Sequence, residues 1–198
     1  MNTSDIRNKF TPALLSISLI VLILLNVLVI FMAQSQQNKL FYEVLYTARL
    51  TMFLFNIAVC LFVFQSRENL TINKFWMLFW TGSFIAYAVH VYYSFFLFFD
   101  GSVSNFYGAQ GVFVATLNLV ITFWWLFDII LIWFTDLEKK WVAIQRYGIN
   151  ILVFLAFFVS TVFLHAVDNK ELFVIIMGYV LGISTAACIA IQIFGKKK

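Results

Sequence analysis

The sequence predicts an all-α fold, an integral membrane bundle of six transmembrane helices with both termini cytoplasmic. Of the 198 residues, 63% are hydrophobic and only 11% are charged, whereas a soluble globular domain carries about a quarter charged residues. Apolar runs of about 20 residues, enough to cross a hydrocarbon core of about 30 Å as a helix, recur along the chain. These runs are continuous rather than alternating, which favours helices over a membrane barrel.

Six apolar runs predict the six spans. The first opens at Pro12, the only proline, which is tolerated in a first helical turn because the N–H group it lacks would be unbonded there. The second is short unless Arg49 extends its guanidinium to the membrane interface. The segment FYEVLYTAR before it is expected to be a short helix lying in that interface. The predicted spans are residues 12–32, 46–65, 75–99, 110–134, 148–167 and 172–194.

The segments between the spans leave no room for a soluble domain, so residues 1–198 are predicted to form a single transmembrane domain. The loop DGSVSNFYGAQG between the third and fourth spans is interpreted as a turn, because Gly, Asp, Asn and Ser are common turn residues. We detect no internal repeat, which counts against the transporters built from inverted repeats.

The distribution of basic residues predicts the orientation. Ten of the thirteen Lys and Arg residues fall on the side that carries both termini, and an excess of positive charge marks the cytoplasmic side. The net charge of +4 therefore reflects membrane orientation and anionic lipid headgroups rather than nucleic acid. We expect a multi-pass protein of the plasma or inner membrane.

Polar residues follow one face of the third span and one face of the fourth. At about 100° per residue, His90 and Tyr87 share a face, as do Asn118 and Thr122. Because a short loop connects these spans, we expect them to be neighbours and the two faces to meet, with His90 within reach of Asn118 or Tyr87. The predicted polar pocket consists of Ser83, Tyr87, His90, Ser94, Asn118, Thr122 and Asp128.

Asp128 is an acidic residue within an apolar run, where a carboxylate costs about 2.5 to 3.5 kcal/mol on insertion scales. It therefore needs a partner, and Lys139, Lys140 or the indole N–H of Trp124 are candidates; protonation is the alternative. Two interpretations of the polar residues stay open. They form hydrogen bonds that join helices, or they line a pocket that opens to the outer side.

A metal site is a further hypothesis. His165 and Asp168 are three residues apart on one helical face, and together with Asp100 and His90 they could bind zinc, iron or manganese. Haem ligation by His90 and His165 would require equal depth, whereas the helical rise gives an offset of about 7 Å. No cofactor is strongly indicated.

Small residues recur at every fourth position of the sixth span. This pattern lets two helix backbones approach closely in lipid, and the partner is either another helix of this chain or a second subunit. The 25 Phe and six Trp residues are interpreted as lipid-facing bulk and interfacial belts. The small residues are Gly178, Gly182, Ala186 and Ala190.

The sequence contains no GxxxxGK[ST], HExxH, GxSxG or Cys-x-x-Cys motif, which favours a non-enzymatic role. The first hypothesis is a subunit or ligand- or lipid-binding module of a membrane assembly, forming a homo- or hetero-oligomer through its sixth span. The alternative is a membrane-embedded metal- or haem-dependent redox protein that uses His90 and His165. A small channel or transporter is the second alternative.

Overall fold

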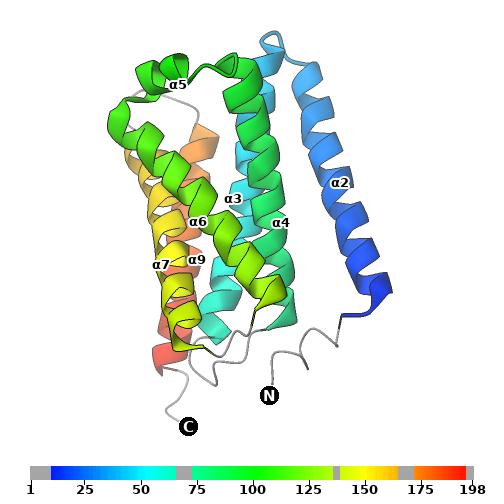
Figure 1. Ribbon diagram of the computed structural model, residues 1–198, viewed down its shortest axis with the longest axis vertical. Helices are drawn as coiled ribbons and strands as arrows, with labels where there is room; N and C mark the ends of the chain where they lie inside the picture. The colour runs from blue at the N-terminus through cyan, green and yellow to red at the C-terminus, as the bar shows by residue number, and fades with distance from the viewer. Residues whose placement is uncertain (1–9, 66–72, 136–138, 165–171, 195–198) are drawn as a thin grey trace.

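The computed structural model describes residues 10–65, 73–135, 139–164 and 172–194. Within these ranges the regular structure is helical, and six helices are long and apolar enough to cross a membrane. The predicted all-α bundle of six long helices is therefore confirmed (Figure 1). The elements are α2 (Pro12–Gln34), α3 (Lys39–Gln65), α4 (Lys74–Val91) with its π-helical continuation η1 (Tyr92–Phe98), α5 (Val103–Gln110), α6 (Val112–Phe134), α7 (Lys140–Phe158) with its π-helical continuation η2 (Val159–Leu164), and α9 (Leu172–Phe194).

Local sequence signals set the starts of several helices. The Thr11 hydroxyl accepts a hydrogen bond from the backbone N–H of Leu14 at 3.2 Å, and the side chain of Asn73 caps α4 in the same way. Such caps satisfy N–H groups that have no partner within the helix. Between α5 and α6, Gly111 has a φ of 76°, a conformation that glycine adopts without strain. The loop expected here as a turn thus contains the short helix α5.

Two helices begin earlier than the sequence predicted. The second starts at Lys39 rather than at residue 46, so the segment 41–49 is the beginning of α3 and not a separate interfacial helix. The fifth starts at Lys140 rather than at residue 148. In both cases a polar residue near the start of the helix, Glu43 or Arg146, is buried against the bundle. The sixth helix has the predicted bounds.

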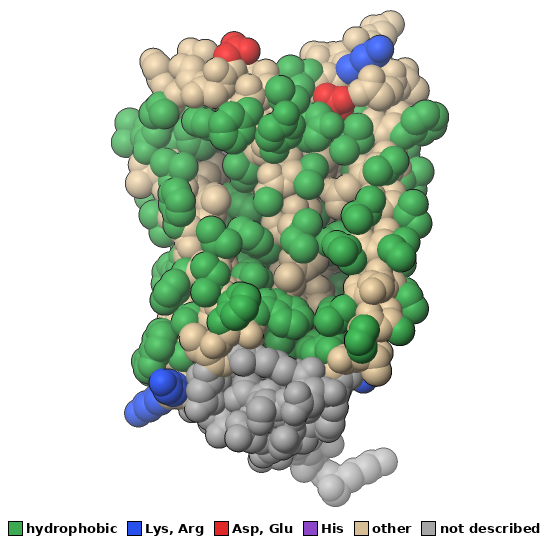
Figure 2. Space-filling view, turned by 45° about the vertical axis from the view of Figure 1, so that its right-hand side comes forward, with side chains coloured by type: hydrophobic (Ala, Val, Ile, Leu, Met, Phe, Trp, Pro, Cys, Tyr) green, Lys and Arg blue, Asp and Glu red, His purple; other side chains and the backbone are tan. Residues whose placement is uncertain are grey.

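The helix α3 occupies the centre of the bundle, where it packs against α2, α4 and α9. In Figure 1 α6 crosses the face of the bundle diagonally, and α5 lies across the upper end. The helix α2 stands at the edge and buries only Leu22, Asn26 and Ala33. Figure 2 shows hydrophobic side chains around the middle of the molecule, with charged side chains at its two ends. This distribution suits a protein surrounded by lipid.

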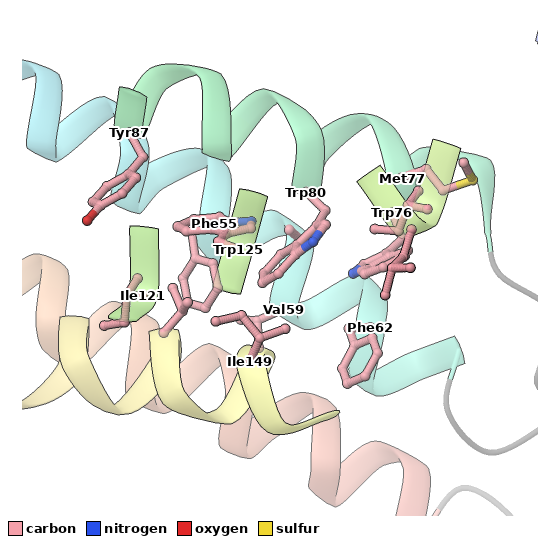
Figure 3. Packing of buried hydrophobic residues seen from close by; sticks show 14 of the residues in the cluster. Phe55, Val59, Phe62, Trp76, Met77, Trp80, Tyr87, Ile121, Trp125 and Ile149 are labelled. Carbon is pink, nitrogen blue, oxygen red and sulfur yellow. The ribbon is translucent and has the colours of Figure 1, made fainter. Parts of the chain in front are cut away.

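Aromatic rings fill the interior of the bundle (Figure 3). The rings of Tyr87 and Trp125 lie 5.5 Å apart, those of Trp125 and Trp80 lie 4.7 Å apart, and those of Trp80 and Trp76 lie 5.9 Å apart. All three tryptophans are 0% exposed. They belong to the core and not to the lipid-facing belt expected from the sequence.

The small residues of α9 are divided between two environments. Gly178 and Gly182 pack within the chain: a Cβ atom on Gly178 would lie 2.7 Å from Cγ2 of Val162, and one on Gly182 would lie 2.7 Å from Cε2 of Phe158. Ala186, in contrast, is exposed. Close approach to η2 and α7 therefore explains the two glycines.

Candidate functional site

A buried carboxylate joins three helices in the half of the bundle where α6 ends and α7 begins. Asp128 of α6 is 0% exposed. The indole N–H of Trp80 in α4 donates to its Oδ2 atom at 2.8 Å, and the amide of Gln145 in α7 donates to its Oδ1 atom. The Nε atom of Arg146 lies 3.8 Å from Oδ1. We call these four residues the Asp128 centre.

The prediction of Lys139, Lys140 or Trp124 as the partner of Asp128 is wrong. Lys139 and Lys140 are exposed at the start of α7, and Arg146, about 9 Å further along the helix, carries the charge that pairs with the carboxylate. The indole N–H of Trp124 donates to Oε1 of Gln145 at 3.0 Å, and Gln145 in turn donates to Asp128. The predicted fifth span begins after Arg146, whereas α7 includes this residue.

The guanidinium of Arg146 is not fully satisfied by this centre. Its side chain is 5% exposed, and its Cζ atom lies 5.4 Å from the centre of the Trp76 ring. The Nε and Nη2 atoms of Arg146 and the Nε1 atom of Trp76 are buried and have no hydrogen-bond acceptor among the described residues. A buried donor without an acceptor costs about 1 to 3 kcal/mol, and more when it is charged. Two of these nitrogens therefore belong to the guanidinium itself, and the third belongs to the ring beside it.

The polar faces of α4 and α6 meet at Tyr87, as expected. The Tyr87 hydroxyl lies 2.8 Å from Oγ1 of Thr122, and Thr122 donates to the carbonyl of Asn118 at 2.7 Å. The Asn118 amide donates to Oε1 of Gln110 in α5 at 2.7 Å. These bonds join α4, α5 and α6.

His90 contacts a different helix from the one predicted. Its Nδ1 atom lies 3.0 Å from the carbonyl oxygen of Val44 and 3.5 Å from Oγ1 of Thr47, both in α3. Of the two neighbours expected for His90, Asn118 is replaced by α3, whereas the Tyr87 ring does lie beside it, with 6.2 Å between ring centres. A carbonyl accepts only, so Nδ1 carries the proton in the neutral ring and Nε2 keeps its lone pair.

The seven predicted pocket residues thus do not gather in one pocket. They fall into the group around Tyr87, the contact of His90 with α3, and the Asp128 centre. Ser83 donates to the carbonyl of Phe79 in its own helix, and Ser94 donates to that of Val91 at 3.3 Å. Hydroxyls on helices commonly bond to the preceding turn in this way.

Two of the four residues in the metal hypothesis are not described. His165 and Asp168 lie outside the described residues, and Asp100 is exposed in a turn with a φ of 54°. Within the described ranges, no group of three His, Cys, Asp or Glu side chains could hold a metal ion. The proposed ligand set stays a prediction.

Sequence reasoning missed Trp80, Gln145 and Arg146 as partners of Asp128. One signal could have found Arg146: Asp128 lies six residues before the end of α6, and Arg146 lies six residues after the start of α7. In a helical hairpin these positions have the same depth. Opposite charges at equal depth in apolar helices are expected to pair.

The comparisons with known proteins do not add a relative. Family models, curated proteins and solved structures give no match to this chain. Any role for the Asp128 centre, for the group around Tyr87 or for His90 is therefore inferred from geometry and chemistry.

Proposed function

We propose that this chain is a non-enzymatic subunit, or a ligand- or lipid-binding module, of a membrane assembly. The Asp128 centre is the observation that carries the proposal. Its carboxylate is fully buried and faces donors from α4 and α7. An acidic group surrounded in this way is suited to fixing the positions of three helices rather than to contacting a substrate.

Other polar residues are used in the same manner. The indole of Trp133 in α6 donates to the hydroxyl of Thr81 in α4 at 3.0 Å. The hydroxyl of Ser184 in α9 donates to Oδ1 of Asn56 in α3 at 2.7 Å. Bonds of this kind between membrane helices contribute about 0.6 kcal/mol each on average. Several of them together favour one fixed arrangement, which suits a structural subunit.

The surface of α9 offers a route for association. Gly178 and Gly182 are occupied by contacts within the chain, but Ala186 is exposed one turn further along the same stripe. We therefore assign the predicted oligomer contact to the part of the sixth span around Ala186. A small exposed residue there lets a helix of another subunit approach closely.

The test is purification of the tagged chain from its native membrane in mild detergent. We expect a partner in stoichiometric amount, or a particle mass above that of one chain, and reduced association for Ala186→Leu. The matched control is Ala187→Leu, because Ala187 is also exposed but lies about 100° away around the helix. A monomer without partners, unchanged by Ala186→Leu, would contradict the proposal.

A redox protein is the second candidate, and the geometry of His90 favours it. The bond from Nδ1 to the Val44 carbonyl is the kind of contact that orients imidazole ligands, and it leaves Nε2 able to bind a metal. Absorption spectroscopy and elemental analysis of the purified protein separate the two candidates. A Soret band or one bound metal per chain, lost in His90→Ala, would support the redox protein and contradict the non-enzymatic proposal.

A further inference from the structure

The Asp128 carboxylate has hydrogen-bond donors for both of its oxygens, whereas two nitrogens of Arg146 have no acceptor among the described residues. Trp80 and Gln145 each donate to one oxygen of the Asp128 carboxylate. Arg146 approaches that carboxylate only to 3.8 Å, which is an ion-pair distance but too long for a hydrogen bond. The charge of Arg146 is therefore partly balanced, while its donors Nε and Nη2 have no acceptor in the part of the chain that the structure describes.

Trp76 adds a third donor beside this cation. Its ring stacks on Trp80 with 5.9 Å between centres and lies 5.4 Å from Cζ of Arg146. Its Nε1 atom is buried without an acceptor. All three nitrogens donate and none accepts, and one group is a cation. The chemical complement of this set is an anionic group with several acceptor oxygens, such as a phosphate.

The set lies near the end of the bundle where α4 and α7 begin. Trp76 is the third residue of α4 and Arg146 is the seventh of α7, so they lie about 3 Å and 9 Å along their helices. Lys74 and Lys140 are the first residues of these helices. Tryptophan and basic residues at helix ends are typical of the level of lipid headgroups.

From these observations we infer that Arg146 and Trp76 bind an anionic phosphate group, supplied by a phospholipid headgroup or by free phosphate. The inference names a ligand class for the binding module of the proposed function and rests on it. The three nitrogens are covered by protein, so a phosphate reaches them only when neighbouring side chains at this end of the bundle move aside.

The test measures binding to the purified full-length chain in neutral detergent. One arm adds phosphatidylglycerol in mixed micelles, a second adds inorganic phosphate, and each records the shift of the thermal unfolding midpoint. Ligand binding to the folded state raises the midpoint. A shift with phosphatidylglycerol alone assigns the ligand to a lipid, and a shift with inorganic phosphate assigns it to the free anion.

Trp76→Phe is the decisive variant, since it removes the indole N–H and keeps an aromatic ring beside Arg146. We expect its apparent affinity to fall about tenfold, the loss for one hydrogen bond to a charged group. Arg146→Gln should abolish the shift. The matched control is Trp125→Phe, because the Trp125 Nε1 atom is also buried without an acceptor but its ring stacks on Tyr87.

The inference is overturned if neither ligand shifts the midpoint, or if Trp76→Phe and Trp125→Phe weaken binding equally. The Trp76 variant decides the question even if Arg146→Gln does not fold. Recovery of partners from native membrane is measured separately. Loss of phosphate binding with intact partner recovery would therefore reject this inference and leave the proposed subunit role in place.

Discussion

Two polar residues of the core, Asp128 and Tyr87, differ in what their removal leaves behind. Asp128 is a fully buried acidic group with donors from two other helices around it. The Tyr87 hydroxyl makes only neutral contacts, with Oγ1 of Thr122 at 2.8 Å and with the carbonyl oxygen of Asn118 at 3.4 Å. Removing the Asp128 carboxylate leaves the buried cation of Arg146 without its counter-ion. Removing the Tyr87 hydroxyl leaves the Thr122 hydroxyl, which still donates to the Asn118 carbonyl in its own helix.

We predict that Asp128→Ala lowers the free energy of unfolding by about 3 to 5 kcal/mol. The variant leaves Arg146 buried without a counter-ion and leaves the N–H groups of Trp80 and Gln145 without their acceptor. Tyr87→Phe should lower the same free energy by only about 0.6 kcal/mol. Equilibrium unfolding of both variants in one detergent gives the comparison, and equal losses would show that the Asp128 centre is not what fixes α4, α6 and α7.

The sequence was sufficient for the existence of the helices but not for where two of them begin. Apolar length marks a span, so all six long helices were predicted. Burial of Glu43, which accepts a hydrogen bond from the amide of Gln34, extends α3 in a way that local hydropathy does not show. Burial of Arg146 beside Asp128 extends α7 for the same reason.

The partners of polar side chains were the least predictable part. The stripe on α4 was recognised from its period, and the contact of Tyr87 with Thr122 follows from it. His90 instead faces α3, because three helices surround α4 and a one-dimensional pattern does not say which of them a given face meets. Distant pairs such as Ser184 with Asn56 have no local signal at all.

At the level of elements, we predict that Gly178→Ala destabilises the contact between α9 and η2. A methyl group there would lie 2.7 Å from Cγ2 of Val162, and overpacking of this kind typically costs about 1 to 3 kcal/mol. The control is Ala187→Leu, which also enlarges a side chain but at an exposed position of the same helix. Thermal unfolding in detergent should show a lower midpoint for Gly178→Ala only; equal midpoints would mean that α9 shifts freely.

At the level of the whole molecule, the even number of long helices puts the start of α2 and the end of α9 at the same end of the bundle (Figure 1). The excess of Lys and Arg near that end predicts that it is cytoplasmic. Burial of Arg146 removes one charge from that count, but the other basic residues on this side still outnumber those on the opposite side.

This orientation can be tested with single cysteines in a chain whose Cys60 and Cys188 are replaced by alanine. Asn105→Cys lies on α5 at an exposed position and should react with a membrane-impermeant maleimide added to intact cells. Lys197→Cys, one residue before the last of the sequence, should react only after permeabilisation. The reverse pattern of labelling would place both termini outside.

The position of α3 has a consequence for biogenesis. It packs against α9, which follows it by more than 100 residues in the chain, and Asn56 receives the hydroxyl of Ser184 across that separation. While the ribosome is still making the intervening helices, this amide has no α9 to meet, and the Cys60 thiol one turn along α3 still donates to its Oδ1 atom at 3.8 Å. The contact between α3 and α9 therefore forms only after α9 has been translated. A chain truncated before α9 would lack this contact of its central helix.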